Sequence, residues 1–450
     1  MIPDLRGAPT SAPAPEALEV FETALASLYQ NRGEPLALIK PCIEQWPQWS
    51  LPHSFKAIVL LGFTERRFAL AAAKSLKAAE PLLASATERE RTIHAAANQI
   101  LAGNWSAACA LFEQLLIEHP LDMLALHSAQ NLDFFRGDLW ALRNRVNRVL
   151  PAWRAETTGY GFVLGMHAFG LEECNQYPEA ESVAQEALAL HPENPWAVHA
   201  LAHVFEMQGR VEEGIEHLSS GAHLWAPESG FAYHNWWHLA LFHLERGDDE
   251  AVLALYDREL GEPEARFALN MLDAAALLWR LHLLGIDTGE RAQSVASWWR
   301  DQIEEGGGYY AFNDFHAALA LALAEIQNGE PDALEALEAR LQPAPGGDGA
   351  EDGRTRITRT IGAPLVRAVR DYVVGNYAQC AQAMASLRDA AQQFGGSHAQ
   401  RDLITLTLMD AAARAGNRNL ARHYLNEREV LKPASVLSER LRTRHAELAA

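Results

Sequence analysis

Apolar residues recur every three or four positions through most of this chain, which is the spacing of helices with one buried face. Short polar breaks interrupt the pattern. Each break has Gly or Asn at its start and, in most cases, a small residue a few positions later. They begin at Gly103, Gly137, Asn175, Gly209, Gly247, Gly329, Gly375 and Gly416. Because these residue types take the left-handed conformation that ends a helix, the breaks predict pairs of helices joined by tight turns.

The breaks also recur at a repeat-like distance. Neighbouring breaks lie 34 or 38 residues apart between Gly103 and Gly247, and further apart later in the chain. Proline follows the second helix of a pair at Pro120, Pro192 and Pro227, where it stops the helix. The stretch YPEAESVAQEALALHPENPWA is typical of a tetratricopeptide repeat. The predicted fold is therefore all-α, a tetratricopeptide-like helical-repeat solenoid of antiparallel helix pairs stacked into a superhelix.

Turn residues and proline suggest where the array begins and is interrupted. Residues 1–15, MIPDLRGAPTSAPAP, are expected to form a flexible Pro-rich arm. Residues 16–342 form the array, and PAPGGDGAEDG at 343–353 is expected to be a flexible loop. Residues 354–450 are predicted to continue the array with further helical repeats.

Charge and cysteine content narrow the range of partners. Fifty-eight acidic and 38 basic side chains give a formal charge of −20, which repels phosphate backbones and anionic membranes. No nucleic-acid or membrane partner is therefore expected. The four cysteines form no CxxC pair, and the chain has neither an export signal nor a long apolar run. These features indicate a cytoplasmic protein, and they leave its oligomeric state open.

Two helices carry histidine pairs with the same spacing. His199, His203 and Glu206 fall at about 0°, 40° and −20° around one helix axis, so they share a narrow stripe. His234 and His238 repeat the spacing on a later helix, and Glu245 lies on their stripe. Asn235 and Trp237 flank this second pair and are expected to line a pocket, whereas His243 falls on the opposite face. Since the first helices of repeat units line the concave surface, both stripes are expected to face one groove.

Two further segments carry polar groups at predicted helix starts. The first presents Asn313, Asp314 and His316, and Asp314 also suits the positive end of a helix dipole. The second, GGSHAQRD, presents Ser397 and Arg401 in a first turn that could take an anion, although Ser397 also fits an ordinary N-cap.

Imidazoles beside carboxylates support two kinds of chemistry. They could hold a divalent metal such as zinc through His199, His203, His234 and His238, or they could act as general bases and acids without one. The spacing alone does not separate these alternatives, so the cofactor stays open. Motifs of the zincin, serine-hydrolase, P-loop and dinucleotide-binding classes are absent from the sequence.

Long stretches between about residues 100 and 445 resemble the tetratricopeptide repeat protein 38 family. The resemblance lies in GNWSAACALFEQLLIEHPLDMLAL, SVAQEALALHPENPWAVHALAHVFEM, HNWWHLALFHLERGDDEAVLALYD, MLDAAALLWRL, FNDFH, GGSHAQRD and YLNEREVLKPASVLSERL. It implies the repeat fold and supplies no reaction. It also implies a common set of positions, namely His199, His203, Glu206, His234, Asn235, Trp237, His238, Glu245, Asn313, Asp314, His316, Gly395, Gly396, Ser397, Gln400, Arg401 and Asp402.

Three functions fit these residues. The first is an enzyme or small-molecule binder for a small polar, anionic ligand, with amide or ester hydrolysis as the simplest reaction. Its catalytic groups would be His199, His203, Glu206, His234, His238, Asp314 and His316, and its substrate-binding groups Asn235, Trp237, Asn313, Ser397 and Arg401. The second is a scaffold that binds a partner peptide in the groove. The third is a purely structural layer of buried hydrogen bonds.

Overall fold

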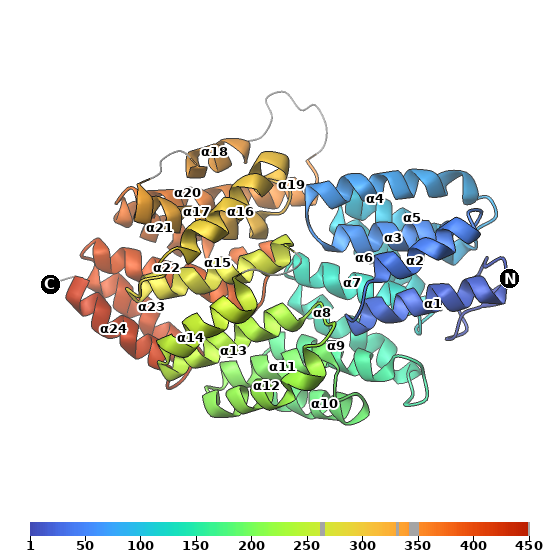
Figure 1. Ribbon diagram of the computed structural model, residues 1–450, viewed down its shortest axis with the longest axis horizontal. Helices are drawn as coiled ribbons and strands as arrows, with labels where there is room; N and C mark the ends of the chain where they lie inside the picture. The colour runs from blue at the N-terminus through green and yellow to red at the C-terminus, as the bar shows by residue number, and fades with distance from the viewer. Residues whose placement is uncertain (262–265, 330–332, 342–350, 449–450) are drawn as a thin grey trace. The chain divides into compact units, whose positions relative to one another are not determined.

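The computed structural model describes residues 1–261, 266–329, 333–341 and 351–448 of the chain (Figure 1). In these ranges nearly all regular structure is helical, and the one sheet is a two-stranded pair at the N-terminus. The predicted all-α helical-repeat class is confirmed. The chain forms two compact units, with Met1–Leu201, Ala222–Ala232 and Asp352–Arg354 in the first and the remaining residues in the second. The division falls inside one helix, after Leu201.

The first unit is a series of antiparallel helix pairs. Its elements are β1 (Ile2–Pro3), β2 (Pro9–Thr10), α1 (Pro15–Gln30), α2 (Pro35–Gln45), α3 (Ser50–Gly62), α4 (Arg66–Ala79), α5 (Glu88–Leu101), α6 (Trp105–Glu118), α7 (Met123–Phe135), α8 (Leu139–Val149), α9 (Tyr160–Glu173) and α10 (Tyr177–Leu190), with 3₁₀ turns η1 (Glu80–Leu82) and η2 (Leu150–Ala152). Each odd-numbered helix in this series packs against the even-numbered helix that follows it.

Helix α11 (Pro195–Met207) passes from the first unit into the second, and α12 (Val211–Trp225) passes back. The second unit continues with α13 (Ala232–Arg246), α14 (Asp249–Leu255), α15 (Ala268–Leu283), α16 (Arg291–Gly306), α17 (Ala311–Asn328), α18 (Ala333–Arg340), α19 (Gly353–Ile357), α20 (Ala363–Val373), α21 (Tyr377–Leu387), α22 (His398–Arg414), α23 (Arg418–Leu431) and α24 (Val436–Leu448). Two π-helical turns, η3 (Tyr256–Leu260) and η4 (Thr358–Gly362), and the 3₁₀ turn η5 (Ala391–Phe394) lie between them.

The helices end where the sequence predicts. All eight break residues have positive φ, for example 81° at Gly103 and 60° at Asn175. Asp138, Asp248 and Asn417, which follow three of these glycines, accept a hydrogen bond from the backbone N–H three residues later and so begin the next helix. The sequence therefore sets both the end of one helix and the start of the next.

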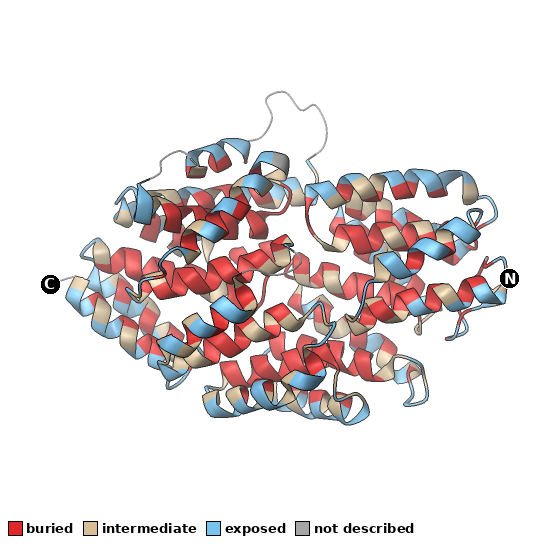
Figure 2. Ribbon diagram, viewed as in Figure 1, coloured by how far each residue is buried: buried red, intermediate tan, exposed pale blue. Residues whose placement is uncertain are grey.

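Helix pairs bury unequal shares of their surface (Figure 2). In α9, every residue after Tyr160 is buried, whereas α10 buries only Ala180, Ala184 and Ala187. These alanines are the small contact residues that the repeat pattern predicts. Gly170 serves the same purpose where α9 meets α8, because a side chain there would collide with the backbone of Arg143. Small residues thus let neighbouring helices approach closely.

The N-terminal residues differ from the expected loose arm. Strands β1 and β2 pair antiparallel, and Ala8, Thr10 and Ala12 are buried. Arg89 of α5 lies 3.4 Å from Asp4 and 2.5 Å from Asp122. Buried ion pairs therefore hold this segment against the rest of the first unit. The proline-rich composition of the segment gives no indication of these pairs.

Most of the predicted loop at 343–353 lies outside the described residues; Gly353 begins α19. Among the described helices, none combines the length and the apolar character needed to cross a lipid bilayer.

Replacing Arg89 by leucine tests the anchor of the N-terminal segment. The change leaves Asp4 and Asp122 buried without their cation, so we expect a loss of about 3–5 kcal/mol in the free energy of unfolding. Urea denaturation measures this loss, and limited proteolysis should show faster cleavage before Pro15. Lys40→Leu is the control, because its pair with Glu44 is exposed and 3.8 Å long. Equal stability of the two variants would contradict the account.

Candidate metal centre

Three histidines of the second unit converge from two helices. α11 contributes His203, and α13 contributes His234 and His238, which are one turn apart. A ring nitrogen of each lies within 4.8 Å of the others, and the ring centroids of His203 and His238 are 4.4 Å apart. His203 and His238 are completely buried, whereas the His234 side chain remains 19% exposed. The sequence-predicted pairing of the two histidine helices is therefore realised by these three residues.

Two carboxylates orient the α13 histidines. Nδ1 of His234 donates to Oδ2 of Asp273, on α15, at 2.7 Å. Nδ1 of His238 donates to Oε2 of Glu206, on α11, at 3.2 Å. Since ionised carboxylates only accept hydrogen bonds, both protons belong on Nδ1. The opposite ring atoms, the two Nε2 nitrogens, face each other at 3.2 Å.

Burial governs the charges of these groups. It lowers the pKa of His238, and it lowers the pKa of His203 well below the ordinary value for histidine. Burial alone would raise the pKa of Glu206, but Lys432 and His238 together hold it well below its usual range. At neutral pH the centre therefore has an ionised Glu206 beside two neutral imidazoles.

The facing Nε2 atoms create an electrostatic conflict. A neutral His238 with its proton on Nδ1 has a lone pair on Nε2, and so does a neutral His234 held by Asp273 in the same way. Two lone pairs at 3.2 Å repel unless something positive lies between them. Either a proton, which would make His234 cationic, or a metal ion resolves the conflict. With a proton the centre is a hydrogen-bonded histidine pair, and with a metal ion it is a metal site.

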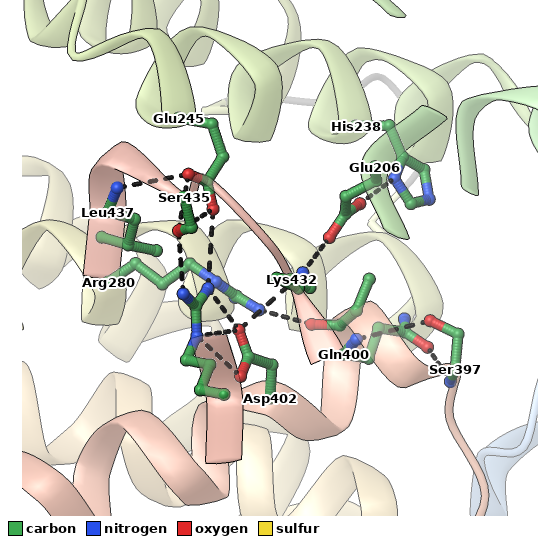
Figure 3. Close-up of polar contacts among 12 residues, drawn as sticks. Glu206, His238, Glu245, Arg280, Ser397, Gln400, Asp402, Lys432, Ser435 and Leu437 are labelled. Atoms are coloured by element: carbon green, nitrogen blue, oxygen red, sulfur yellow. Dashed lines mark hydrogen bonds and ion pairs between the residues drawn. The ribbon is translucent and has the colours of Figure 1, made fainter. Parts of the chain in front are cut away.

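A network of charges lies behind Glu206. Nζ of Lys432, in the segment between α23 and α24, donates to Oε1 of Glu206 at 2.5 Å and is 3.9 Å from Asp402, as Figure 3 shows. Arg428 of α23 pairs with Asp402 at 3.0 Å and with Glu245 at 3.5 Å. Glu245 also accepts a hydrogen bond from the Ser435 hydroxyl. Two cations therefore serve three carboxylates.

A second branch runs from Asp273 to α22. Nε2 of Gln400 donates to Oδ1 of Asp273 at 3.4 Å. The same side chain accepts from the backbone N–H of Ser397, while the Ser397 hydroxyl accepts from the Gln400 N–H. This reciprocal capping box starts α22. The structure thus gives Ser397 the N-cap role and uses Gln400 to link the cap to the histidines.

His199 occupies a different environment. It precedes His203 by one turn of α11 but belongs to the first unit. Its ring lies 4.9 Å from that of Phe169 and 4.8 Å from that of Phe231, both in the first unit. Within that unit His199 packs among aromatic side chains.

Asn235 and Trp237, which lie between His234 and His238 in the sequence, are fully buried. The Trp237 ring stacks on His234 at 5.2 Å, with the Arg280 guanidinium 5.4 Å from its centroid. Neither the Trp237 Nε1 nor the two amide atoms of Asn235 have a hydrogen-bond partner among the described residues. Buried polar atoms are normally paired, so this cluster suits a bound molecule.

The α17 residues divide between turn and core. Oδ1 of Asp314 accepts the Gly308 N–H at 3.0 Å, which closes the turn before the helix, and Asn313 is buried beside it. Nδ1 of His316 donates to the Phe312 carbonyl, and Nε2 has no hydrogen-bond partner among the described residues. Burial lowers the pKa of His316 to about 4, so its ring is neutral. Arg401 donates to the Gly396 carbonyl of the turn before α22.

Sequence reasoning missed Asp273, Lys432 and Arg428. Asp273 lies within the apolar run MLDAAALL and Lys432 follows Val430 and Leu431, which is a recognisable signal because buried charges need partners. Arg428 stands between two glutamates and gives no such signal. The expected open groove also differs from the structure, since His203, Glu206, Asn235, Trp237, His238 and His316 are all buried.

One family profile and several solved structures are similar to this chain. The sequence profile of the tetratricopeptide repeat family matches residues 173–223. Human IFIT1, solved as a dimer with m7Gppp-AAAA, is 14% identical over 96% of this chain and 100% of its own, with a TM-score of 0.44. The Naa15/Naa10 complex bound to HypK-THB is 15% identical over 96% of this chain and 62% of its own, with a TM-score of 0.25. The chain is a helical-repeat protein that contains tetratricopeptide repeat sequence.

Proposed function

We propose that this protein binds a divalent transition-metal ion, of which zinc is the best match, through His203, His234 and His238. The observation that carries the proposal is the 3.2 Å approach of two Nε2 atoms whose Nδ1 partners are both carboxylates. The three proposed ligands all belong to the second unit, whereas His199, one turn before His203 on α11, belongs to the first.

The donor set fits zinc chemically. Two nitrogens bound to one tetrahedral zinc at about 2.0–2.1 Å lie roughly 3.3 Å apart, close to the observed separation. Carboxylates that hold the outer nitrogen of a ligand histidine are the usual outer partners of zinc sites, and Asp273 and Glu206 stand in that position. Four carboxylates, those of Glu206, Glu245, Asp273 and Asp402, lie among three cations, Arg280, Arg428 and Lys432, and this surplus of negative charge also favours a bound cation.

Removing one ligand should remove the metal. We expect purified or zinc-loaded protein to hold about one zinc per chain by elemental analysis, and His238→Ala and His203→Ala to hold little. His243→Ala is the matched control, because His243 lies on the same helix and contacts Arg246 instead. A wild-type chain that retains no zinc after loading and buffer exchange would refute the proposal.

The carboxylates should tune affinity without binding the ion. Asp273→Asn keeps the size of the side chain but removes its charge, so we expect about 10–100-fold weaker zinc binding in a competition titration with a chromogenic chelator. Asp248→Asn serves as the control because that carboxylate caps α14. If Asp273→Asn binds zinc as tightly as the wild type does, Asp273 has no role in the metal centre.

Hydrolysis of an amide or ester is a second candidate function. A divalent ion held by His203, His234 and His238 would supply Lewis acidity to a carbonyl group. The observation that favours it is the Asn235 side chain, which is buried on the same helix as His234 and His238 and has a donor and an acceptor with no partner among the described residues. These two atoms match the hydrogen-bonding groups of an amide.

Asn235→Leu separates catalysis from stability. Removing an orphaned buried amide should raise the free energy of unfolding by about 1–3 kcal/mol, while turnover of chromogenic amide and ester substrates by zinc-loaded protein falls. Thermal denaturation and initial rates measure the two effects. A destabilised Asn235→Leu would assign the residue to packing, and lack of turnover by the wild type across the substrate panel would reject hydrolysis.

The resemblance to the tetratricopeptide repeat protein 38 family supports the same positions, and we propose membership in that family on the motifs quoted above. The four free cysteines and the acidic balance support a cytoplasmic location. The alternative role, a scaffold for a partner peptide, is less favoured because the polar side chains are buried.

A further inference from the structure

A small cavity lies in the first unit, apart from the histidine centre. It has a volume of about 50 Å³, is partly open, and is lined by residues of α1, α3, α5, α6 and α7. The walls are mostly apolar, with Val59 and Trp105 among them, and none of the lining residues carries a carboxylate, ammonium or guanidinium group. Polar side-chain atoms come from Asn131, Ser128, His127 and Trp105, and the Trp105 Nε1 already donates to the Ile100 carbonyl.

His127 is the polar group that the protein leaves available. Its side chain is 3% exposed, and its Nδ1 has no hydrogen-bond partner among the described residues. Burial lowers the pKa of His127 to about 4, so the imidazole is neutral at physiological pH. Its neighbour Ser128 already donates its hydroxyl proton to the Leu124 carbonyl. Such an orphan is costly unless a ligand or water pairs with it.

We propose that this cavity binds a short, uncharged aliphatic group that carries one hydroxyl or carbonyl. The apolar walls take the carbon chain, and the imidazole of His127 bonds the oxygen. Charged ligands are excluded because burying a charge without a counter-charge is costly. Size limits the ligand further, since an apolar cavity of about 150 Å³ holds a benzene ring and this one has about a third of that volume.

Gly62 gives a direct way to fill the cavity. It lines the cavity at the end of α3, and a Cβ built there meets no atom within 4 Å. We expect Gly62→Leu to keep or raise the thermal unfolding midpoint, because leucine favours helix over glycine, and to abolish binding of ethanol in a saturation-transfer NMR titration. Leu70→Phe, on the exposed side of α4 in the same unit, is the control and should bind as the wild type does.

The polar contact is tested by His127→Leu, which keeps an apolar wall but removes the hydrogen bond. We expect ethanol to bind about fivefold to tenfold more weakly. Acetate, which has the same chain length but a charge, should give no saturable signal. The proposal is overturned if the wild type does not bind ethanol, if Gly62→Leu and His127→Leu both bind it unchanged, or if acetate binds equally well. Zinc loading should not alter any of these results.

Discussion

Two carboxylate–imidazole hydrogen bonds determine what the centre can do. Asp273 and Glu206 draw the protons of His234 and His238 to Nδ1 and leave the Nε2 lone pairs facing each other. If either carboxylate were an amide or were protonated, the ring could carry its proton on the other nitrogen, and the conflict would disappear. The helices around the centre keep this arrangement from relaxing, because His203 and Trp237 pack against the same rings.

Burying Glu206 beside the histidines is costly, and the C-terminal helices offset that cost. Lys432 supplies the nearest cation, and it is itself held near Asp402. Arg428 adds a second cation, and its ion pair holds Asp402 in place beside Lys432. Burial would raise the pKa of Asp402, but Arg428 and Lys432 hold it below its usual value, so it stays ionised. The centre thus depends on residues that make no contact with its imidazoles.

The fold could be predicted closely because helix ends are encoded locally. Gly103, Asn175 and the other break residues set the turns through one backbone angle, whatever packs around them. The histidine pairs were also visible, since the i, i+4 spacing places both rings on one face. Their partners were not, because Asp273 and Lys432 come from distant helices and only tertiary packing brings them near. The structure differs from the predicted loose N-terminal arm for the same reason, because Arg89, which holds the arm through Asp4, lies on a helix distant in sequence.

The contact between Lys432 and Glu206 spans 226 positions of the chain. A ribosome synthesises from the N-terminus, so every histidine of the centre leaves the exit tunnel long before the lysine that balances its glutamate. Until translation is almost complete, the nascent second unit lacks the lysine that balances Glu206. Premature termination between α13 and Lys432 would release a chain that has all three histidines but not this cation.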